Sequence, residues 1–405
     1  MLDVNCNYMT KPLPEMRFFM KTIKSIIPNP VFKYNFPYNL DEIAFFDIET
    51  TGLSPKVSSL YLIGMMYYDN DINSWTLIQW FADNYKSEAE IINSFFSLLL
   101  KYKYLYHFNG RTFDIPHIRN KCQKHNIKIS DDIEKILNES IDILASVRPI
   151  KKLLSIEKAN QTFLERWLDI IRDDTYNGGE LIAVYSEYMQ KKIMSPEESV
   201  KLEEILLLHN HDDIAQMLNV CSIMSYYDFL TSDNQINITS VLIDEDAMLQ
   251  ISFDVSYTFP KRVTITKPFP ENKSGVLTDI YATLVLDNNT VFLSVPVLEG
   301  TLMYFMKDYK NYYYMPSNDV IIHKSVINSE EKKLCRKATA ATCHIKKEGI
   351  FIPSLTLRHM NDTANIFYIE HKDKVCFYEL PDVPFDINDT FFRDYALLQI
   401  SGFTS

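Results

Sequence analysis

The pattern of apolar and polar positions divides the chain into two parts. Between residues 41 and 230, short apolar runs alternate with segments in which apolar residues recur at helical spacing. From 237 to 322 β-branched and aromatic runs dominate, and turn-forming residues interrupt them. Residues 1–40 contain several prolines and show no clear period, so we predict an N-terminal arm there.

The first part begins with a strand that ends near Thr50, and its other elements follow in a regular order. Apolar runs at 58–68 and 75–81 flank Asp69-Asn70-Asp71, which predicts a hairpin. The pattern then predicts a helix at 87–101, a strand at 104–108, a helix from Asp114, a strand at 140–144, helical segments at 151–188 broken at Asn177-Gly178-Gly179, and a long helix at 196–227. This order is typical of an α/β domain, a mixed sheet flanked by helices. We therefore predict such a domain at 41–230 and a β-rich second domain, of unknown role, at 237–405.

Composition narrows the classes of protein that fit this pattern. A chain of 405 residues exceeds a comfortable single core, and 46% apolar with 13% aromatic residues suffice for packed domains. The six cysteines are scattered without CxxC spacing, and we find no secretory leader and no apolar run of about 18 residues. We expect a soluble, cytoplasmic protein with no membrane partner. Because the formal charge is −12, a nucleic-acid partner would have to meet local basic patches and metal ions.

Two acids at the end of the first strand are the strongest candidates for chemistry. Asp47 and Glu49 are two positions apart, so in a strand they share one face at roughly 7 Å. The spacing alone is weak, because acids fill 53 of 405 positions. Here, however, the pair ends an apolar strand and leads into Thr50-Thr51-Gly52-Leu53, so charge lies at the rim of a core. A divalent metal ion would neutralise it.

Further acidic positions are open to two interpretations each. Asp114 follows a strand and the turn Asn109-Gly110, where it is either a functional acid or a helix N-cap, and Asn109 is equally explicable as a turn residue. Asp142 ends a short strand and either lines the same edge or caps a helix. On the long helix, His209 and Asp213 are four apart and share a face that is either functional or simply solvated. The reserve candidates are His211 and Asp212, the latter turned about 100° away.

Taken in order, these segments resemble the DEDD group of the ribonuclease H-like superfamily, whose members are 3′→5′ exonucleases, and more closely its bacterial YprB-type branch. The resemblance covers roughly residues 40–228. It rests on the late His209-x-x-x-Asp213 pair, on Phe108-Asn109-Gly110-Arg111-Thr112-Phe113-Asp114, and above all on Phe46-Asp47-Ile48-Glu49-Thr50-Thr51-Gly52-Leu53.

The resemblance implies a metal-dependent nuclease with two Mg²⁺ or Mn²⁺ ions. Its implied metal ligands are Asp47, Glu49, Asp114 and Asp213, which with His209 make the implied catalytic set. Better-known relatives place a tyrosine four residues before the last aspartate or a histidine five before it, so His209 takes the tyrosine position, either as a base or as a substrate contact. The implied substrate-binding residues are Thr50, Thr51, Leu53, Asn109 and Arg111. Rival interpretations are an endonuclease on the same fold and an inactive nucleic-acid-binding or scaffold protein.

Two basic segments bear on the partner. Residues 101–129 hold seven Lys or Arg against one acid, which fits either phosphate binding or a solvated helix face. Residues 323–347 hold seven against two, and we expect a nucleic-acid-binding surface there, with Tyr312–Tyr314 either stacking on bases or packing in a core. A zinc site is disfavoured because the local spacing matches no standard pattern; its candidate ligands are His323, Cys335, Cys343 and His344. A protein partner of the β-rich domain is also conceivable.

Overall fold

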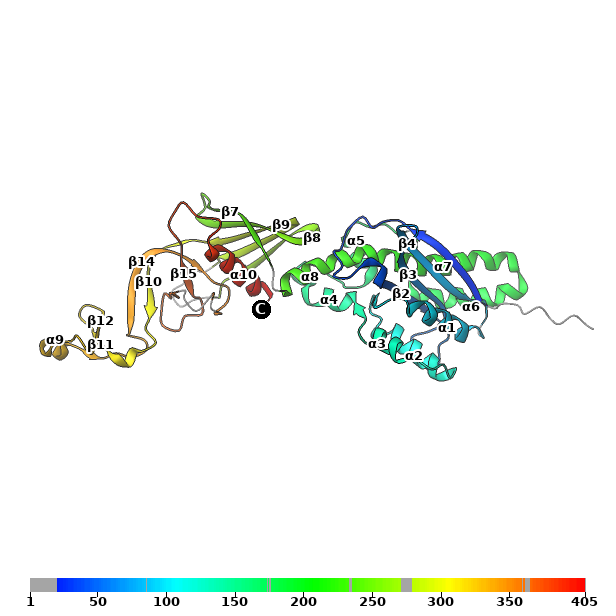
Figure 1. Cartoon of the computed structure of the whole chain (residues 1–405), viewed down its shortest axis with the longest axis horizontal. Coiled ribbons are helices and arrows are strands. Elements are labelled where there is room, and N and C mark those ends of the chain that lie inside the picture. The colour runs from blue at the N-terminus through cyan, green and yellow to red at the C-terminus, as the bar shows by residue number, and fades with distance from the viewer. Residues whose placement is uncertain are drawn as a thin grey trace, which may run out of the picture. The chain divides into compact units, whose positions relative to one another are not determined.

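A computed structural model describes residues 20–84, 86–172, 174, 176–232, 235–270, 279–358, 360 and 365–404. The described residues form two compact units, drawn in Figure 1. The first holds residues 20–31, 36–145 and 170–219, and the second holds residues 32–35, 146–169 and those from 220 onward. Among the described residues, no helix combines the length and apolar character needed to cross a bilayer.

A six-stranded mixed sheet forms the centre of the first unit. Its strand order is β1-β4-β3-β2-β5-β6. The strands are β1 (Met20–Ile27), β2 (Ile43–Thr50), β3 (Leu60–Asp69), β4 (Ser74–Ala82), β5 (Tyr104–His107) and β6 (Ile141–Asp142). Strand β2 is antiparallel to β3 and parallel to β5, so it lies where the sheet changes from antiparallel to parallel. The predicted fold class and the hairpin of β3 and β4 are confirmed.

Helices alternate with these strands and follow them along the chain, and some of them belong to the second unit. They are α1 (Glu88–Leu99), α2 (Asp114–Lys124), α3 (Asp131–Asn138), α4 (Ile143–Ile150), α5 (Gln161–Trp167), α6 (Gly178–Met194), α7 (Pro196–Val220) and α8 (Met224–Thr231), with 3₁₀ turns at Leu40–Glu42 and Cys221–Ile223. Helix α1 is amphipathic and buries Ile91, Phe95 and Leu99 against the sheet. The Phe95 ring stacks on that of Phe46, with centroids 5.4 Å apart. Side chains two apart from Phe46 therefore face this core, and the acids of β2 face the opposite side.

Some predicted boundaries differ from the structure. Residues 20–27, expected in an arm without period, form edge strand β1, which pairs with β4 along its whole length. Pairing covers an edge of β4 that would otherwise be open; the rest of the arm up to residue 19 lies outside the described residues. The strand expected at 140–144 is only Ile141–Asp142, because α4 begins at once. The break at Asn177 is a helix start, since Asn177 and Glu180 form a capping box for α6.

The described residues of the second unit are β-rich, as predicted, and form three three-stranded sheets. They are β7 (Asn237–Ile243), β8 (Met248–Pro268) and β9 (Tyr281–Pro296); β10 (Leu298–Phe305), β14 (His344–Pro353) and β15 (Phe377–Glu379); and β12 (Val320–His323), β11 (Tyr312–Met315) and β13 (Arg336–Lys337). Helices α9 (Ser329–Leu334) and α10 (Thr390–Thr404) and a 3₁₀ turn at Tyr309–Asn311 accompany them. Along much of the long strands β8 and β9, buried side chains alternate with partly or fully exposed ones, as expected for strands that cover a core with one face.

Candidate metal centre

The end of β2 carries the first two candidate acids. Asp47 is partly buried and Glu49 is only 7% exposed, and their odd-numbered positions place both on the face opposite to the Phe46 core. The register between β2 and β3 shifts between Glu49 and Thr50. Such an irregularity bends a strand and re-aims its side chains. The strand therefore ends by presenting two carboxylates at one edge of the sheet.

Asp114 reaches the same strand from the next segment. Its Oδ1 accepts a hydrogen bond from the backbone N–H of Ile48, 3.1 Å away, between the two acids of β2. The approach follows from topology, because β2 and β5 are parallel and the turn after β5 leads directly into α2. Gly110 in that turn is required, since a Cβ there would lie 2.7 Å from His107 Cγ. Asn109 takes a left-handed conformation with φ of 64°.

Helix α7 supplies the third segment. The Nε2 atom of His209 lies 3.7 Å from Oε1 of Glu49 and 3.4 Å from Oδ2 of Asp213. One potential ligand atom from each of these three residues lies within 4.8 Å of the others, a spacing that could hold a metal ion. The structure thus brings Asp47, Glu49, Asp114, His209 and Asp213 to one edge of the sheet.

The segment between α5 and α6 adds two residues that the sequence interpretation missed. Asp174 Oδ2 lies 2.6 Å from Nδ1 of His209, and a guanidinium nitrogen of Arg172 lies 2.6 Å from Oδ1 of Asp213. The backbone N–H of Asp174 donates to Asp212, 3.2 Å away, so that reserve candidate supports this segment. The segment has no periodic pattern, and sequence carried no signal for it.

A second missed group holds Asp47 from the α7 side. The side-chain amide of Asn210 donates to Oδ2 of Asp47 at 3.0 Å, and its oxygen accepts from Gln79 at 3.0 Å. In the sheet, Gly64 lies between Asp47 and Gln79. A Cβ at Gly64 would be 2.3 Å from Asn210 Oδ1 and 2.2 Å from Ile214 Cδ1. A polar residue four positions before a buried isoleucine on one helix face was the available signal.

Crowded burial changes the protonation of the acids. Burial first, and then the charges of Asp114, Asp213 and Glu49, raise the pKa of Asp47 well above its usual range. Burial likewise raises the pKa of Glu49 to about 8 despite the opposing effect of His209, and that of Asp114 to about 7. Burial alone would lower the pKa of His209, but the carboxylates of Glu49, Asp213 and Asp174 outweigh it and raise the pKa. Cations are therefore favoured at this edge.

The donor set fits a divalent metal ion. Carboxylate oxygens are the ligands that Mg²⁺ and Mn²⁺ prefer, and an imidazole nitrogen is compatible with Mn²⁺. The raised pKa values show that the acids retain protons when no stronger cation offsets them. Asp47, Glu49, Asp114 and Asp213 are the residues that would hold such ions.

The predicted substrate-binding residues around this edge differ in their hydrogen bonds and in their exposure. Thr50 donates to the carbonyl of Gly52, and Thr51 Oγ1 accepts from the N–H of Ser59, so both threonines fix the loop after β2. Leu53 is 83% exposed on that loop. Arg111 donates to the carbonyl of Ser140 at 2.6 Å although the residue is exposed.

The loop of Leu53 is held by a buried ion pair. Lys121 is fully buried, and its ammonium donates to the carbonyls of Pro55, at 2.8 Å, and Ser58. Its Nζ lies 3.9 Å from Oε1 of buried Glu88, which itself accepts from the N–H of Leu60 at 2.7 Å. Lys121 and Asp114 are seven residues apart on α2, so they lie on the same helix face. The first turn of this face carries Asp114 to the other acids, and two turns later Lys121 holds the loop.

The remaining sequence candidates have local roles. Asp142 accepts from the backbone N–H groups of Asn109 and Leu144, which matches the predicted capping alternative. His211 contacts Asp212 at 3.2 Å. Much of the basic run at 101–129 is engaged: Lys103 pairs with Glu42, Arg119 with Glu134, and Lys124 with Glu88.

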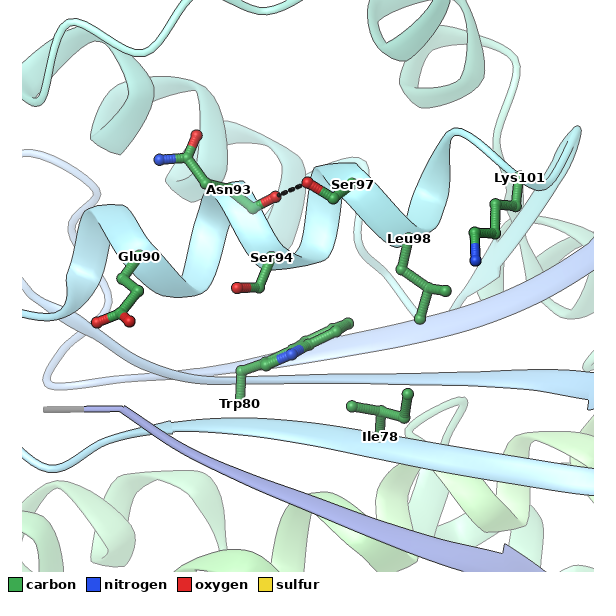
Figure 2. A pocket seen from close by; sticks show the side chains of 8 residues that line it. All are labelled: Ile78, Trp80, Glu90, Asn93, Ser94, Ser97, Leu98 and Lys101. Carbon is green, nitrogen blue, oxygen red and sulfur yellow. Dashed lines mark hydrogen bonds between the residues drawn. The ribbon is translucent and has the colours of Figure 1, made fainter. Parts of the chain in front are cut away.

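Two other regions of the described chain do not extend this site. An open pocket of about 720 Å³ lies between α1 and β4, where Figure 2 shows Trp80 under the helix and Ser97 donating to the Asn93 carbonyl; none of the five candidate catalytic residues lines it. Among the described residues, the zinc candidates of residues 323–347 do not form a group that could hold a metal ion.

Comparison with known proteins gives one family-model match, to the central part of the chain. Residues 44–225 match the family model described as RNase_H superfamily. The matched residues include strands β2 to β6 of the mixed sheet, and the fold of this stretch is ribonuclease H-like. No curated protein matches the chain.

Several solved structures show a distant likeness. One is the ExoI/SSB-Ct complex, at 13% identity and a TM-score of 0.28 over 53% of this chain and 55% of that one. Another is the family B DNA polymerase from the hyperthermophilic archaeon Pyrobaculum calidifontis, at 11% identity and a TM-score of 0.36, over 75% of this chain and 42% of that one. A third is E. coli exonuclease I in complex with a dA16 oligonucleotide, at 13% identity and a TM-score of 0.28, over 76% of this chain and 64% of that one. The chain thus spans less than two thirds of each, and likeness at this level says nothing about activity.

Proposed function

We propose that residues 41–230 form a divalent-metal-dependent nuclease that hydrolyses phosphodiester bonds of DNA or RNA, working from a 3′ end with two Mg²⁺ or Mn²⁺ ions. The observation that carries the proposal is the convergence of acids from β2, α2 and α7 at one sheet edge, where their pKa values are raised. The match of residues 44–225 to the ribonuclease H superfamily model supports it. Bound ions would activate a water and stabilise the leaving 3′ oxygen.

The chain's own residues would position the reactants. Asn210 holds the Asp47 carboxylate through one oxygen, and the Ile48 N–H holds that of Asp114, so these acids are oriented before ions bind. The exposed Leu53 side chain on its anchored loop would contact a base of the substrate.

His209 is suited to move a proton. If Nδ1 carries the hydrogen that lies against Asp174, 2.6 Å away, Nε2 is free to accept a proton on the side of Glu49 and Asp213. A positioned base of this kind contributes roughly 10²–10⁴ in rate. His209→Asn should therefore lower kcat by that factor, and calorimetry with Mn²⁺ on the same variant measures any contribution of His209 to metal binding separately.

The decisive experiment uses the full chain and 5′-labelled single-stranded 30-mers of DNA and RNA with Mg²⁺, Mn²⁺ or EDTA. We expect a ladder that shortens from the 3′ end, and Asp47→Asn should reduce the rate by at least about 10²–10³-fold. The matched control is Asp71→Asn, an exposed turn residue, which should keep full activity. Absence of cleavage by the wild type, or unaltered cleavage by Asp47→Asn, would refute the proposal.

Two alternatives have distinct outcomes in the same assay. Cleavage of a circular strand would identify an endonuclease, because an exonuclease needs an end. A scaffold without activity is favoured by one observation, the Arg172 guanidinium on Asp213, which already offsets part of the acidic charge. Calorimetric titration with Mn²⁺ separates them, since two bound ions support the nuclease and none supports the scaffold.

A further inference from the structure

A second region of the chain has the opposite charge. Residues 307–347, which we call the basic sheet, contain β11, β12, β13 and α9. They hold nine Lys or Arg and four Asp or Glu, an excess of five positive charges in a chain whose formal charge is −12. A local excess against the overall sign indicates a surface for a negatively charged partner.

Cations and aromatic rings are interleaved on the basic sheet. The ammonium groups of Lys324 and Lys332 lie 6.0 and 5.7 Å from the ring centre of Tyr313. The guanidinium of Arg336 lies 5.2 Å from the ring centre of Tyr314. These are cation–π distances, and the three cations are exposed, so each can also contact an external anion.

Packing leaves the rings and cations of the basic sheet reachable. None of the described side chains of β11, β12, β13 or α9 is buried, and the tyrosines are half-buried. Val326 and Leu334 nearby are 72% and 67% exposed. The core-packing alternative for Tyr312–Tyr314 is therefore not supported, and the surface combines charge with uncovered aromatic and apolar area.

We propose that the basic sheet is a binding site for single-stranded nucleic acid, with Lys324, Lys332 and Arg336 on phosphates and Tyr313 and Tyr314 stacking on bases. It lies on the unit that does not carry the candidate metal centre. In the context of the proposed nuclease it would hold the strand whose end is hydrolysed, and to that extent it rests on that proposal. An acidic protein segment would satisfy the charges but would leave the rings without stacking partners, which favours nucleic acid.

Other ion pairs of the region define which residues to test. Lys333 pairs with Glu330, Lys346 with Asp319 and Lys347 with Glu379. Lys324 donates to a backbone carbonyl, that of Lys310, and no carboxylate of the described residues forms an ion pair with it. Replacement of Lys324, Lys332 and Arg336 by Gln removes three charges and keeps most of each side chain.

The experiment measures binding of fluorescein-labelled dT30 and rU30 to the full chain by anisotropy in EDTA, so it does not depend on hydrolysis. We expect K324Q/K332Q/R336Q to weaken binding at least about tenfold, and the salt slope to fall by about 2, since each lost phosphate contact lowers it by about 0.7. The control K33Q/K158Q/K201Q removes three exposed lysines elsewhere and should bind like the wild type. Circular dichroism checks that both variants fold alike.

Stacking is tested separately by Tyr313→Ser, with Tyr313→Trp as the variant that keeps a ring. Loss of affinity in the first and retention in the second supports the proposal. Equal affinity of all variants, or equal loss in both triple variants, overturns it. Competition by poly-Glu as effective as that by dT30 also overturns it, in favour of an acidic protein partner. An inactive but strand-binding protein would refute the proposed nuclease and leave this inference intact.

Discussion

The candidate metal centre and the basic sheet place charge in opposite ways. At the metal centre, carboxylates of one sign are buried together, and their pKa values rise because neither water nor enough counter-charge surrounds them. On the basic sheet, exposed Lys and Arg side chains are screened by water and salt. Buried like charge thus creates a demand for a small, multiply charged ion, whereas exposed charge suits a long polymer whose own counterions are released.

The largest expected effect that would test this contrast is the pH dependence of stability. Without metal, Glu49 and Asp114, with pKa values of about 8 and 7, keep protons that the unfolded chain loses above about pH 4–5. The folded state then binds more protons, so stability is highest below the unfolded pKa values. It falls by about 1.4 kcal/mol per pH unit for each such proton until the pH reaches the folded pKa values, and it levels off above pH 8. His209, whose pKa is also raised, acts in the same direction.

Thermal unfolding at pH 5, 6.5 and 8 with EDTA or Mg²⁺ measures this. We expect the melting temperature in EDTA to fall with pH and the gain from Mg²⁺ to be largest at pH 8, where protons no longer compete for the acids. Glu49→Gln should flatten the EDTA profile, whereas Glu90→Gln on the exposed face of α1 should not. A metal-free protein that becomes steadily more stable up to pH 8 would contradict the assignment of these acids as buried and crowded.

The next effect comes from removing one buried cation. Lys121→Met removes the ammonium that donates to the carbonyls of Pro55 and Ser58. We expect the free energy of unfolding to fall by about 3 kcal/mol. The loss stays at the lower end for a broken buried ion pair because Glu88 still contacts Lys124 and His125. KM for an oligonucleotide should rise more than kcat falls, since the Leu53 loop loosens while the acids stay. The matched change on the basic sheet, Lys337→Met, should alter stability by less than about 0.5 kcal/mol.

Calorimetry of Mn²⁺ binding distinguishes a loosened loop from a damaged metal centre in Lys121→Met. Unchanged metal affinity with a raised KM is the expected result. A drop in metal affinity equal to the change in kcat/KM would mean that Lys121 acts on the acids and that the loop has no separate role.

The smallest effect concerns close packing. Gly64→Ala would place a Cβ 2.2 Å from Ile214 Cδ1 and 2.3 Å from Asn210 Oδ1, and we expect a cost of roughly 1–2 kcal/mol as α7 shifts. In the second unit, Gly300→Ala meets no atom within 4 Å and should be neutral. Denaturant unfolding of the two variants gives both values, and equal stability of the pair would show that α7 moves away from the sheet without strain.

Much of the fold and the acids of the site could be predicted because they follow periodic patterns. The alternation at Asp47 and Glu49, the turn before Asp114 and the i,i+4 pair on α7 all survive in the structure. Asp174 and Arg172 could not be predicted, because they lie in a segment without period whose place is set by tertiary contacts. The sequence did not predict β1 because this edge strand has little apolar periodicity of its own. Its place in the sheet is set by pairing with β4, which is distant in sequence.

Helix α2 joins two tasks in a single rigid piece. Seven residues separate Asp114 from Lys121, a rise of about 10 Å at 1.5 Å per residue. A straight rod of that length has no joint at which one end could be adjusted alone. An engineered change that tilts α2, for instance to make room for a bulkier strand terminus near the loop, would therefore also move the Asp114 carboxylate out of position.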